Sequence, residues 1–225
     1  MPVITISREF GSEGDSIARQ VAQSLGYHFV DKGFVGTVLG QYGVVEFGQE
    51  YETLPTFWEK FDAQREERRS VMMSMLHQVV RAVARHGNVV ILGRSGFAVL
   101  EGLANVLHVR LQAPLPIRVR RVMAQQEIPI DQAEAAVKEH DRVQTAFIAE
   151  CCSLSWEAIH AFDLVINTGK IPPELAVDWI VRATRGLEEK QVAGERTTDE
   201  IQVDPILASA VSDELGCQLA PIPIS

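Results

Sequence analysis

The sequence is poor in the features that mark membrane, secreted and nucleic-acid-binding proteins. Apolar residues form no uninterrupted stretch of about 18, so no segment predicts a membrane-spanning helix. The residues after Met1 include neither a basic stretch nor a long apolar one, so we expect no signal peptide. With 30 acidic residues against 21 basic ones, the net charge of −9 disfavours general binding to nucleic acids or anionic membranes.

Cysteine is scarce as well. Two of the 3 cysteines, Cys151 and Cys152, are adjacent, and Cys217 lies far along the chain. This number and spacing fit neither a disulfide framework nor a set of metal ligands. We therefore expect free thiols and a cytoplasmic location, with a redox or zinc site as the less favoured alternative.

The sequence does contain a regular alternation of short apolar runs and amphipathic segments. Its 225 residues, 46% of them hydrophobic, suffice for a sizeable core in one or two domains. Apolar runs predict strands at 3–6, 27–30, 89–92, 106–111 and 164–167. Helical patterns lie between and after them, at 17–25, 55–86, 115–126, 131–151 and 172–186. This order predicts an α/β domain with a mostly parallel sheet over residues 1–187.

Two regions do not fit this alternation. Residues 36–54 have no clear periodicity and are expected to be irregular. Residues 188–225 begin with a polar linker, continue with a short helix opened by Asp204 and Pro205, and end in a proline-rich segment. We expect this C-terminal part either to form a docked or frayed tail, or to pack on a partner subunit. A homodimer would fit this tail and the mixed apolar and charged helix at 55–86, but neither requires one.

The loop after the first strand is a candidate phosphate-binding loop, because such loops of α/β proteins combine backbone N–H groups with the positive end of a helix. Gly11 and Gly14 would let the backbone curl around an anion, and Ser16 offers a hydroxyl to a magnesium ion. However, the loop lacks the lysine of the pattern G-x-x-x-x-G-K-[ST], and it holds three carboxylates and one arginine. A plain strand–turn–helix, with Ser12 and Asp15 as a capping box, is therefore an equal alternative.

The opening segment 4–14, ITISREFGSEG, resembles the start of the cytidylate kinase-like family, a branch of the P-loop nucleoside monophosphate kinases. Members of that family begin with a strand followed by S-R-E-F-G-S-G-G and a helix. The similarity continues in the same order along the chain, at 29–32, 90–94, 105–109, 113–121, 141–142 and 162–168. It covers about residues 1–185 and leaves the C-terminal segment outside.

The resemblance implies a P-loop kinase fold, which is a three-layer α/β sandwich with a helical lid and acceptor-binding helices. It implies transfer of the γ-phosphoryl group of ATP, with Mg²⁺, to a nucleoside monophosphate such as CMP or dCMP. The partner of the protein would then be a small-molecule nucleotide and not a nucleic acid polymer. Such chemistry needs positioning and positive charge more than a covalent nucleophile.

The resemblance also implies roles for particular residues. The donor phosphates would lie against the first loop, at Arg8, Gly11, Ser12, Gly14, Asp15 and Ser16. Within that loop, the hydroxyl of Ser16 would contact Mg²⁺. Asp31 and Arg94 fall where acceptor-binding residues lie. Three arginines would act in catalysis, because guanidinium groups grip phosphate oxygens in pairs: Arg118, Arg121 and Arg142.

From the residues alone, each of these assignments has a plainer alternative. Arg118 and Arg121, three residues apart, also fit a solvated helix face. An exposed Arg118 predicts that Arg118→Ala abolishes turnover with little change in melting temperature. Asp31 also fits a turn at the end of a strand, and Arg94 also fits an ion pair with one of the many carboxylates.

The sequence departs from the family pattern at several positions. Asp15 stands where relatives carry a cation, and Glu13 replaces a glycine of the loop. Ser95 stands in place of an aspartate that helps to read cytosine, and Thr37 in place of an arginine for the acceptor phosphate. Three hypotheses follow: a working nucleotide kinase, a non-catalytic nucleotide-binding regulator on the same fold, or a kinase for another small molecule. Restoring a cation by Asp15→Arg is expected to strengthen ATP binding.

Overall fold

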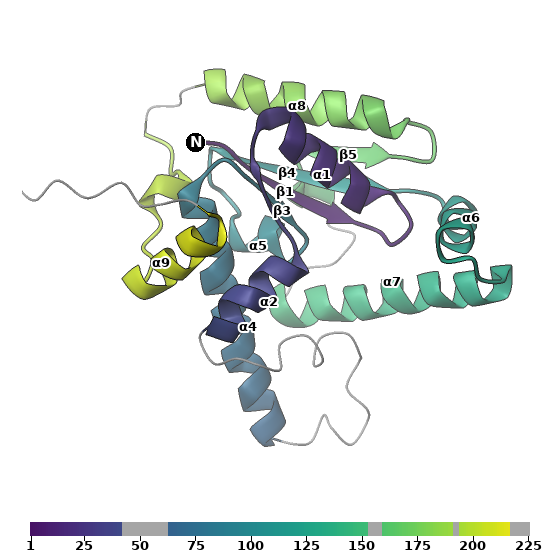
Figure 1. Ribbon diagram of the computed structural model, residues 1–225, viewed down its shortest axis with the longest axis horizontal. Coiled ribbons are helices and arrows are strands. Elements are labelled where there is room, and N and C mark those ends of the chain that lie inside the picture. Colours follow the sequence, from purple (N-terminus) through teal and green to yellow (C-terminus); the bar gives the residue numbers. More distant parts are fainter. Residues whose placement is uncertain (42–62, 153–158, 191–193, 217–225) are drawn as a thin grey trace, which may run out of the picture.

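Five parallel strands form a single sheet in the order β2–β3–β1–β4–β5 (Figure 1). The strands are β1 (Val3–Arg8), β2 (His28–Val30), β3 (Val89–Leu92), β4 (Val106–Gln112) and β5 (Leu164–Asn167), which confirms all the strands predicted from the sequence. The computed structural model describes residues 1–41, 63–152, 159–190 and 194–216. Because β1 lies between β3 and β4, the loop that follows it stands in the middle of the sheet's carboxyl edge.

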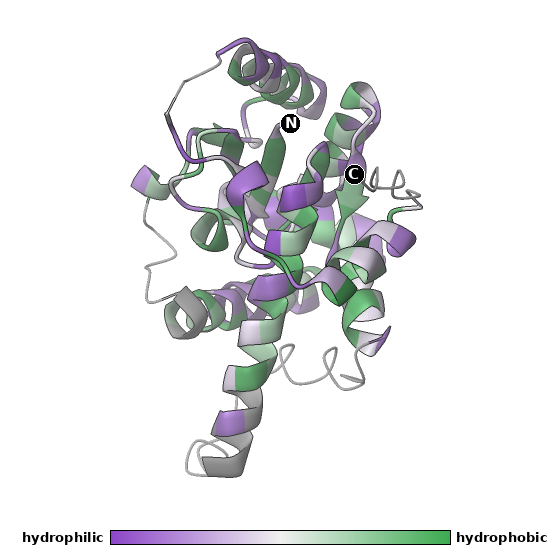
Figure 2. Cartoon of the chain, turned by 90° about the vertical axis from the view of Figure 1, so that its left-hand side faces the viewer, coloured by the Kyte–Doolittle hydropathy of each residue, from purple (hydrophilic) through white to green (hydrophobic). Residues whose placement is uncertain are grey.

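Helices cover both faces of the sheet. On one face lie α1 (Gly14–Leu25) and α8 (Pro173–Glu189), and on the other α2 (Lys32–Gln41), α4 (Ala63–His86), α5 (Gly96–Val99) and α9 (Pro205–Glu214). Side chains alternate along β1, so that Ile4 and Ile6 pack toward the first pair of helices and Val3 toward the second group. Figure 2 shows these central strands as largely hydrophobic. The predicted three-layer α/β architecture is therefore confirmed.

Two further helices form a hairpin beyond the ends of the strands (Figure 1, teal). α6 (Leu115–Gln126) follows β4 and packs on α7 (Ile130–Cys152) through an apolar cluster of their own. The side chains of the two cysteines at the end of α7 are not among the described ones. Short helical turns, η2 (Ile159–Ala161) and η3 (Thr198–Glu200), precede β5 and α9. Within the described ranges, no helix is both long and apolar enough to cross a membrane.

The segment after β2 corrects one expectation. Residues 36–41, expected to be irregular, form the second half of α2. The carboxylate of Asp31 accepts a hydrogen bond from the backbone N–H of Phe34 at 3.1 Å and so holds the first turn of the helix. Burial of its apolar face outweighs the poor helix propensity of its glycines. The rest of the irregular stretch, 42–54, and the expected start of the long helix, 55–62, lie outside the described residues.

The C-terminal part returns to the body of the protein. α9 begins after Asp204, whose carboxylate accepts hydrogen bonds from two N–H groups of the first turn. Leu207 and Val211 of α9 are buried against α4 and α2, in the same apolar cluster as Val3 of β1. This helix therefore completes the layer on that face of the sheet. Cys217 and the proline-rich end lie outside the described residues.

Candidate functional site

The loops that follow the strands meet at the carboxyl edge of the sheet, where ligands of open α/β proteins bind. Hydrogen bonds join them: the N–H of Gly93 donates to the carbonyl of Ile6, and the hydroxyl of Thr168 donates to the carbonyl of Ser12 at 2.9 Å. The predicted site residues gather from this edge. Most of them lie in the loop after β1 and the first turn of α1, at the ends of β2 and β3, and on α6, and Arg142 lies on α7.

The loop after β1 curls tightly in front of α1. Gly11 has a φ of 81°, and a Cβ atom there would lie 2.9 Å from the carbonyl oxygen of Arg118. Ser12 is buried, and its hydroxyl donates to the carbonyl of Glu9 at 2.7 Å. The expected capping box is therefore absent, because this hydroxyl is used inside the loop and Glu13 takes the N-cap position. The curled backbone and the start of a 12-residue helix form the kind of arrangement that binds anions.

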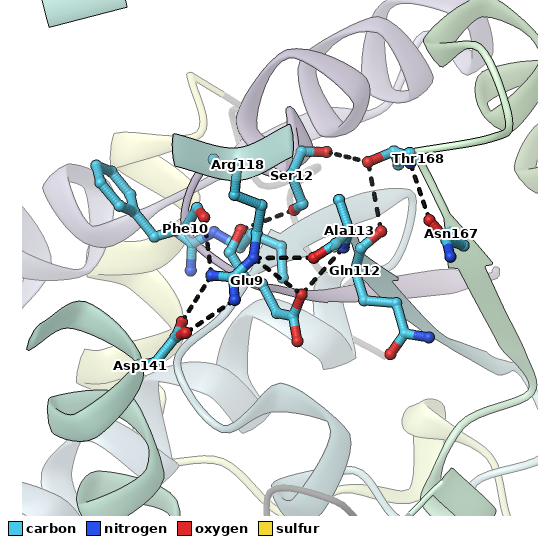
Figure 3. Close-up of polar contacts among 12 residues, drawn as sticks. Glu9, Phe10, Ser12, Gln112, Ala113, Arg118, Asp141, Asn167 and Thr168 are labelled. Carbon is cyan, nitrogen blue, oxygen red and sulfur yellow. Dashed lines mark hydrogen bonds and ion pairs between the residues drawn. The ribbon is translucent and has the colours of Figure 1, made fainter. Parts of the chain in front are cut away.

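Arg118 is buried, which excludes the alternative of a solvated helix face for this residue (Figure 3). Its Nη1 and Nη2 atoms both lie 2.9 Å from the carboxylate oxygens of Asp141 on α7. The same guanidinium donates to the carbonyls of Phe10 at 3.2 Å and Ala113 at 2.9 Å, and its Nε lies 3.4 Å from Glu9 Oε2. Arg118 thus fastens α6 to the loop and to α7. The premise that Arg118 is exposed is wrong, so we expect its removal to lower the stability of the protein.

Arg121 lies one turn further along α6 and also reaches the loop. Its guanidinium donates to the carbonyls of Gly11 at 3.4 Å and Thr168 at 2.8 Å, and to the Thr168 hydroxyl at 3.1 Å. Its Nε lies 3.2 Å from Glu13 Oε1. Arg118 and Arg121 therefore both point at the loop and hold its backbone and its carboxylates, while their role in catalysis stays a prediction.

Each of the three loop carboxylates faces an arginine. Glu9 and Glu13 take part in the pairs just described, and Asp15 Oδ1 lies 3.3 Å from Arg8 Nη2. The second oxygen of Glu13 is buried and has no hydrogen-bond partner among the described residues. The negative charge of the loop is thus offset within the protein itself. A phosphate that is to contact these arginines must replace the carboxylates that they already bind.

The residues predicted for the acceptor lie at the ends of β2 and β3. One oxygen of Asp31 caps α2, and the other accepts a hydrogen bond from Arg19 at 3.0 Å, so the turn expected at this strand end is present. Arg94 follows β3 with a buried Nε atom. Burial and the neighbouring charge of Arg8 lower the pKa of Arg94 to about 10, and the charge of Asp31 opposes this shift. Arg8, which is predicted to bind the phosphate donor, is therefore a neighbour of Arg94, which is predicted to bind the phosphate acceptor.

Two predicted residues remain at the margin of this arrangement. Arg142 is exposed on α7, and its guanidinium contacts Glu139 at 2.7 and 2.9 Å. Ser16 is exposed on the first turn of α1, and its hydroxyl accepts a hydrogen bond from Gln20 at 3.0 Å. Among the described residues, no group of three or more His, Cys, Asp or Glu side chains could hold a metal ion.

Sequence reasoning gave no role to three residues that shape the site. Asp141 binds Arg118, Thr168 links β5 to the loop, and Gln144 of α7 donates to the carbonyl of Arg8 at 3.2 Å. Asp141 and Thr168 both lie in segments that resemble the kinase family, so a signal for them was present. Gln144 lies outside those segments, and its contact with Arg8 depends on the docking of α7.

A glycine-containing loop after a central parallel strand, with arginines reaching it from a helix hairpin, defines an α/β protein of the P-loop kinase type. The sequence model of the cytidylate kinase-like family matches residues 3–170, and the chain belongs to that family. The cytidylate kinase of Ignicoccus hospitalis is 30% identical over 182 residues, which are 81% of this chain and 98% of that protein. The cytidylate kinase of Pyrococcus horikoshii is 24% identical over 203 residues, 88% of this chain and 96% of that one.

Solved structures show the same fold at lower identity. An uncharacterised protein from Eubacterium ventriosum superposes with a TM-score of 0.63 at 19% identity, and the match covers 82% of this chain and 99% of that one. A gluconokinase from Sinorhizobium meliloti superposes with a TM-score of 0.51 at 11% identity, over 85% and 98% of the two chains. At these identities the similarity concerns the fold alone.

Proposed function

We propose that the protein is a nucleotide kinase that transfers the γ-phosphoryl group of ATP to a nucleoside monophosphate, with CMP or dCMP as the acceptor. The observation that carries the proposal is the grip of Arg118 and Arg121 on the loop after β1. Two arginines of one helix thus fix a curled loop at the positive end of another helix. Membership of the family, and relatives named cytidylate kinase, support the same activity.

The donor phosphates would lie against the N–H groups of the loop and of the first turn of α1. Arg121 is the arginine best placed to bind these phosphates, because its guanidinium already contacts the loop carbonyl at Gly11. Bound Mg²⁺ would supply positive charge between the phosphate groups. The exposed hydroxyl of Ser16 fits as its ligand from the protein. Because no carboxylate cluster holds a metal among the described residues, we expect Mg²⁺ to bind together with ATP.

The acceptor would lie on the side of β2 and β3. Arg94 would bind the phosphate of the acceptor, and Asp31 would bind its sugar or base. The side chain of Arg142 would reach the phosphates from α7. Arg142 has to leave its exposed pair with Glu139 for this, and such pairs are weak. The protein would then reside in the cytoplasm, where nucleotides are available.

A second candidate function is a non-catalytic nucleotide-binding regulator. It is favoured by one observation: Glu9, Glu13 and Asp15 already occupy the arginines nearest to the loop. If nucleotide binding cannot displace these carboxylates, the loop will hold ATP without transferring its phosphoryl group.

Titration calorimetry with ATP, with and without Mg²⁺, tests binding, and a coupled assay of ADP formation tests transfer. The acceptor panel contains CMP, dCMP, UMP, AMP and gluconate. We expect ATP binding that Mg²⁺ strengthens, and ADP formation that depends on CMP or dCMP. ATP binding without ADP formation for any acceptor would support the regulator, and ADP formation with gluconate alone would support the third class of kinase.

A matched pair of variants on α6 connects this activity to the site. Arg121→Met removes the contacts with the loop, whereas Arg120→Met changes an exposed neighbour on the same helix. We expect the first to lower kcat by about a hundredfold or more and the second to leave it unchanged. Equal activities of the two variants would contradict the assigned role of Arg121.

A further inference from the structure

Arg8 extends from the end of β1 across the space between two loops. A Cβ atom at Gly14 would lie 2.5 Å from the Cβ of Arg8, and one at Gly93 would lie 2.8 Å from its Nη1. The side chain therefore runs from the loop after β1 to the loop after β3, through space that these glycines leave open. The backbone carbonyl of Arg8 accepts the hydrogen bond from the side chain of Gln144 on α7. Arg8 thus contacts the donor loop, the acceptor loop and the helix hairpin together.

Arg94 directly follows Gly93, the glycine that the guanidinium of Arg8 approaches, and the charge of Arg8 helps to lower the pKa of Arg94. Its φ is 54°, a left-handed value that non-glycine residues seldom adopt. Its Nε atom is buried and has no hydrogen-bond partner among the described residues, so one of its donors is unsatisfied. Two neighbouring cations, of which Arg94 is largely buried and Arg8 is partly exposed, repel each other, and an anion between them would stabilise both. The pair therefore has the character of an anion site that spans the donor and acceptor loops.

We propose that Arg8 binds the phosphoryl group under transfer together with Arg94, which also contacts the acceptor phosphate that receives this group, and that Arg8 takes the place of the lysine that the loop lacks. This inference rests on the proposed function. In the step itself, the bond between the γ-phosphorus and its bridging oxygen breaks, and the electron pair stays on the β-phosphate. A new bond forms between that phosphorus and an oxygen of the dianionic acceptor phosphate, so no proton is needed. The three equatorial oxygens of the transferred group gain charge during the step, and the two guanidinium groups stabilise it.

The ion pair with Asp15 is compatible with this role. Arg8 Nη2 lies 3.3 Å from Asp15 Oδ1, and the side chain of Asp15 is 66% exposed. Exposed pairs of this kind contribute little, so a phosphoryl group with several oxygens can displace Asp15. Asp15 keeps Arg8 directed toward the loop until the nucleotide binds.

The test compares Arg8→Met, Arg94→Met and the double variant with wild type, using inorganic pyrophosphate as the probe in titration calorimetry. Methionine keeps the length of the side chain beside Gly14 and removes its charge. Arg182→Met is the matched control, since Arg182 also forms an exposed pair with an aspartate, on α8. We expect each single variant to bind pyrophosphate at least about tenfold more weakly, and the control to bind as wild type does. Because both arginines hold one group, the loss in the double variant should be smaller than the product of the single losses.

Kinetics supply the second measurement. Arg8→Met should lower kcat by about a hundredfold while the KM for the acceptor changes little, and Arg8→Lys should recover part of kcat. Unchanged pyrophosphate affinity in either single variant with a native melting temperature, or fully additive losses, would overturn the inference. If wild type forms no ADP with any acceptor, the proposed function fails. A loss of pyrophosphate affinity in the double variant that is smaller than the product of the single losses would still support an anion site formed by the two arginines.

Discussion

Replacing Arg118 with alanine should destabilise the protein as well as inactivate it. The guanidinium is the centre of a contact between three parts of the site: the loop after β1, the end of β4 and α7 (Figure 3). Its removal takes the guanidinium away from the carboxylate of Asp141 and leaves Glu9 with the more distant guanidinium of Arg110, whose Nη2 lies 3.9 Å from Glu9 Oε1. It also leaves the carbonyl of Phe10 without one of its donors.

The magnitude follows from the burial of the groups left behind. Removing one partner of a buried ion pair costs about 3–5 kcal/mol. The side chain of Glu9 is 19% exposed and that of Asp141 is 36% exposed, so water can partly replace the lost donor. We therefore take the lower end, about 3 kcal/mol. For a chain of this size, that loss should lower the melting temperature by roughly 6–12 °C.

Urea unfolding followed by circular dichroism measures this effect, and differential scanning calorimetry gives the melting temperature. Arg120→Ala serves as the control, because Arg120 is exposed on the same helix. Arg118→Lys should be intermediate, because lysine keeps the charge but cannot bind Asp141 through two parallel hydrogen bonds. A melting temperature of Arg118→Ala equal to that of Arg120→Ala would refute the structural role given to Arg118.

Other contacts lead to further expected outcomes. Glu13→Gly removes from the loop both a carboxylate and a non-glycine residue with a left-handed backbone. ATP binding in titration calorimetry should therefore tighten about tenfold, without a fall in melting temperature. Weaker ATP binding would contradict the competition between Glu13 and phosphate for Arg121. Leu207→Ala should cost about 3 kcal/mol in urea unfolding because Leu207 is buried, whereas Ile206→Ala, at a residue 71% exposed, should cost little; equal losses would mean that α9 is not docked. Burial lowers the pKa of His108, and the charge of Asp163 opposes this only in part. The unfolded chain therefore binds a proton that the native protein excludes, so stability should fall as pH drops below about 6.5. His108→Asn should weaken this dependence, and an unchanged urea profile from about pH 7 to 5.5 would argue against it.

The strands and helix ends could be predicted because their signals are local. The runs of β3 and β4 are apolar throughout, as strands buried on both faces of a parallel sheet must be. The helices expected to end at residues 25 and 86 do end there, and the glycines that follow, Gly26 and Gly87, both have positive φ values. The resemblance to the kinase family then favoured the loop after β1, among the loops that follow the strands, as the phosphate-binding loop.

The state of the arginines could not be predicted, because it depends on residues distant in the sequence. Arg118 meets Asp141 across 23 positions and Phe10 across 108. An arginine with no local partner is normally expected on the surface. Only the docking of α6 and α7 against the loop shows that this one is buried. The same limit applies to Arg8, whose position between two loops depends on β1 and β3 being neighbours in the sheet.

The docking of α9 has a consequence for how the protein is made. Leu207 and Val211 share an apolar cluster with Val3 at the other end of the described chain and with α4 and α2 in between. On the ribosome, the first strands emerge long before these two residues. Until α9 has been synthesised, the apolar faces of α2 and α4 that it covers are therefore open to solvent.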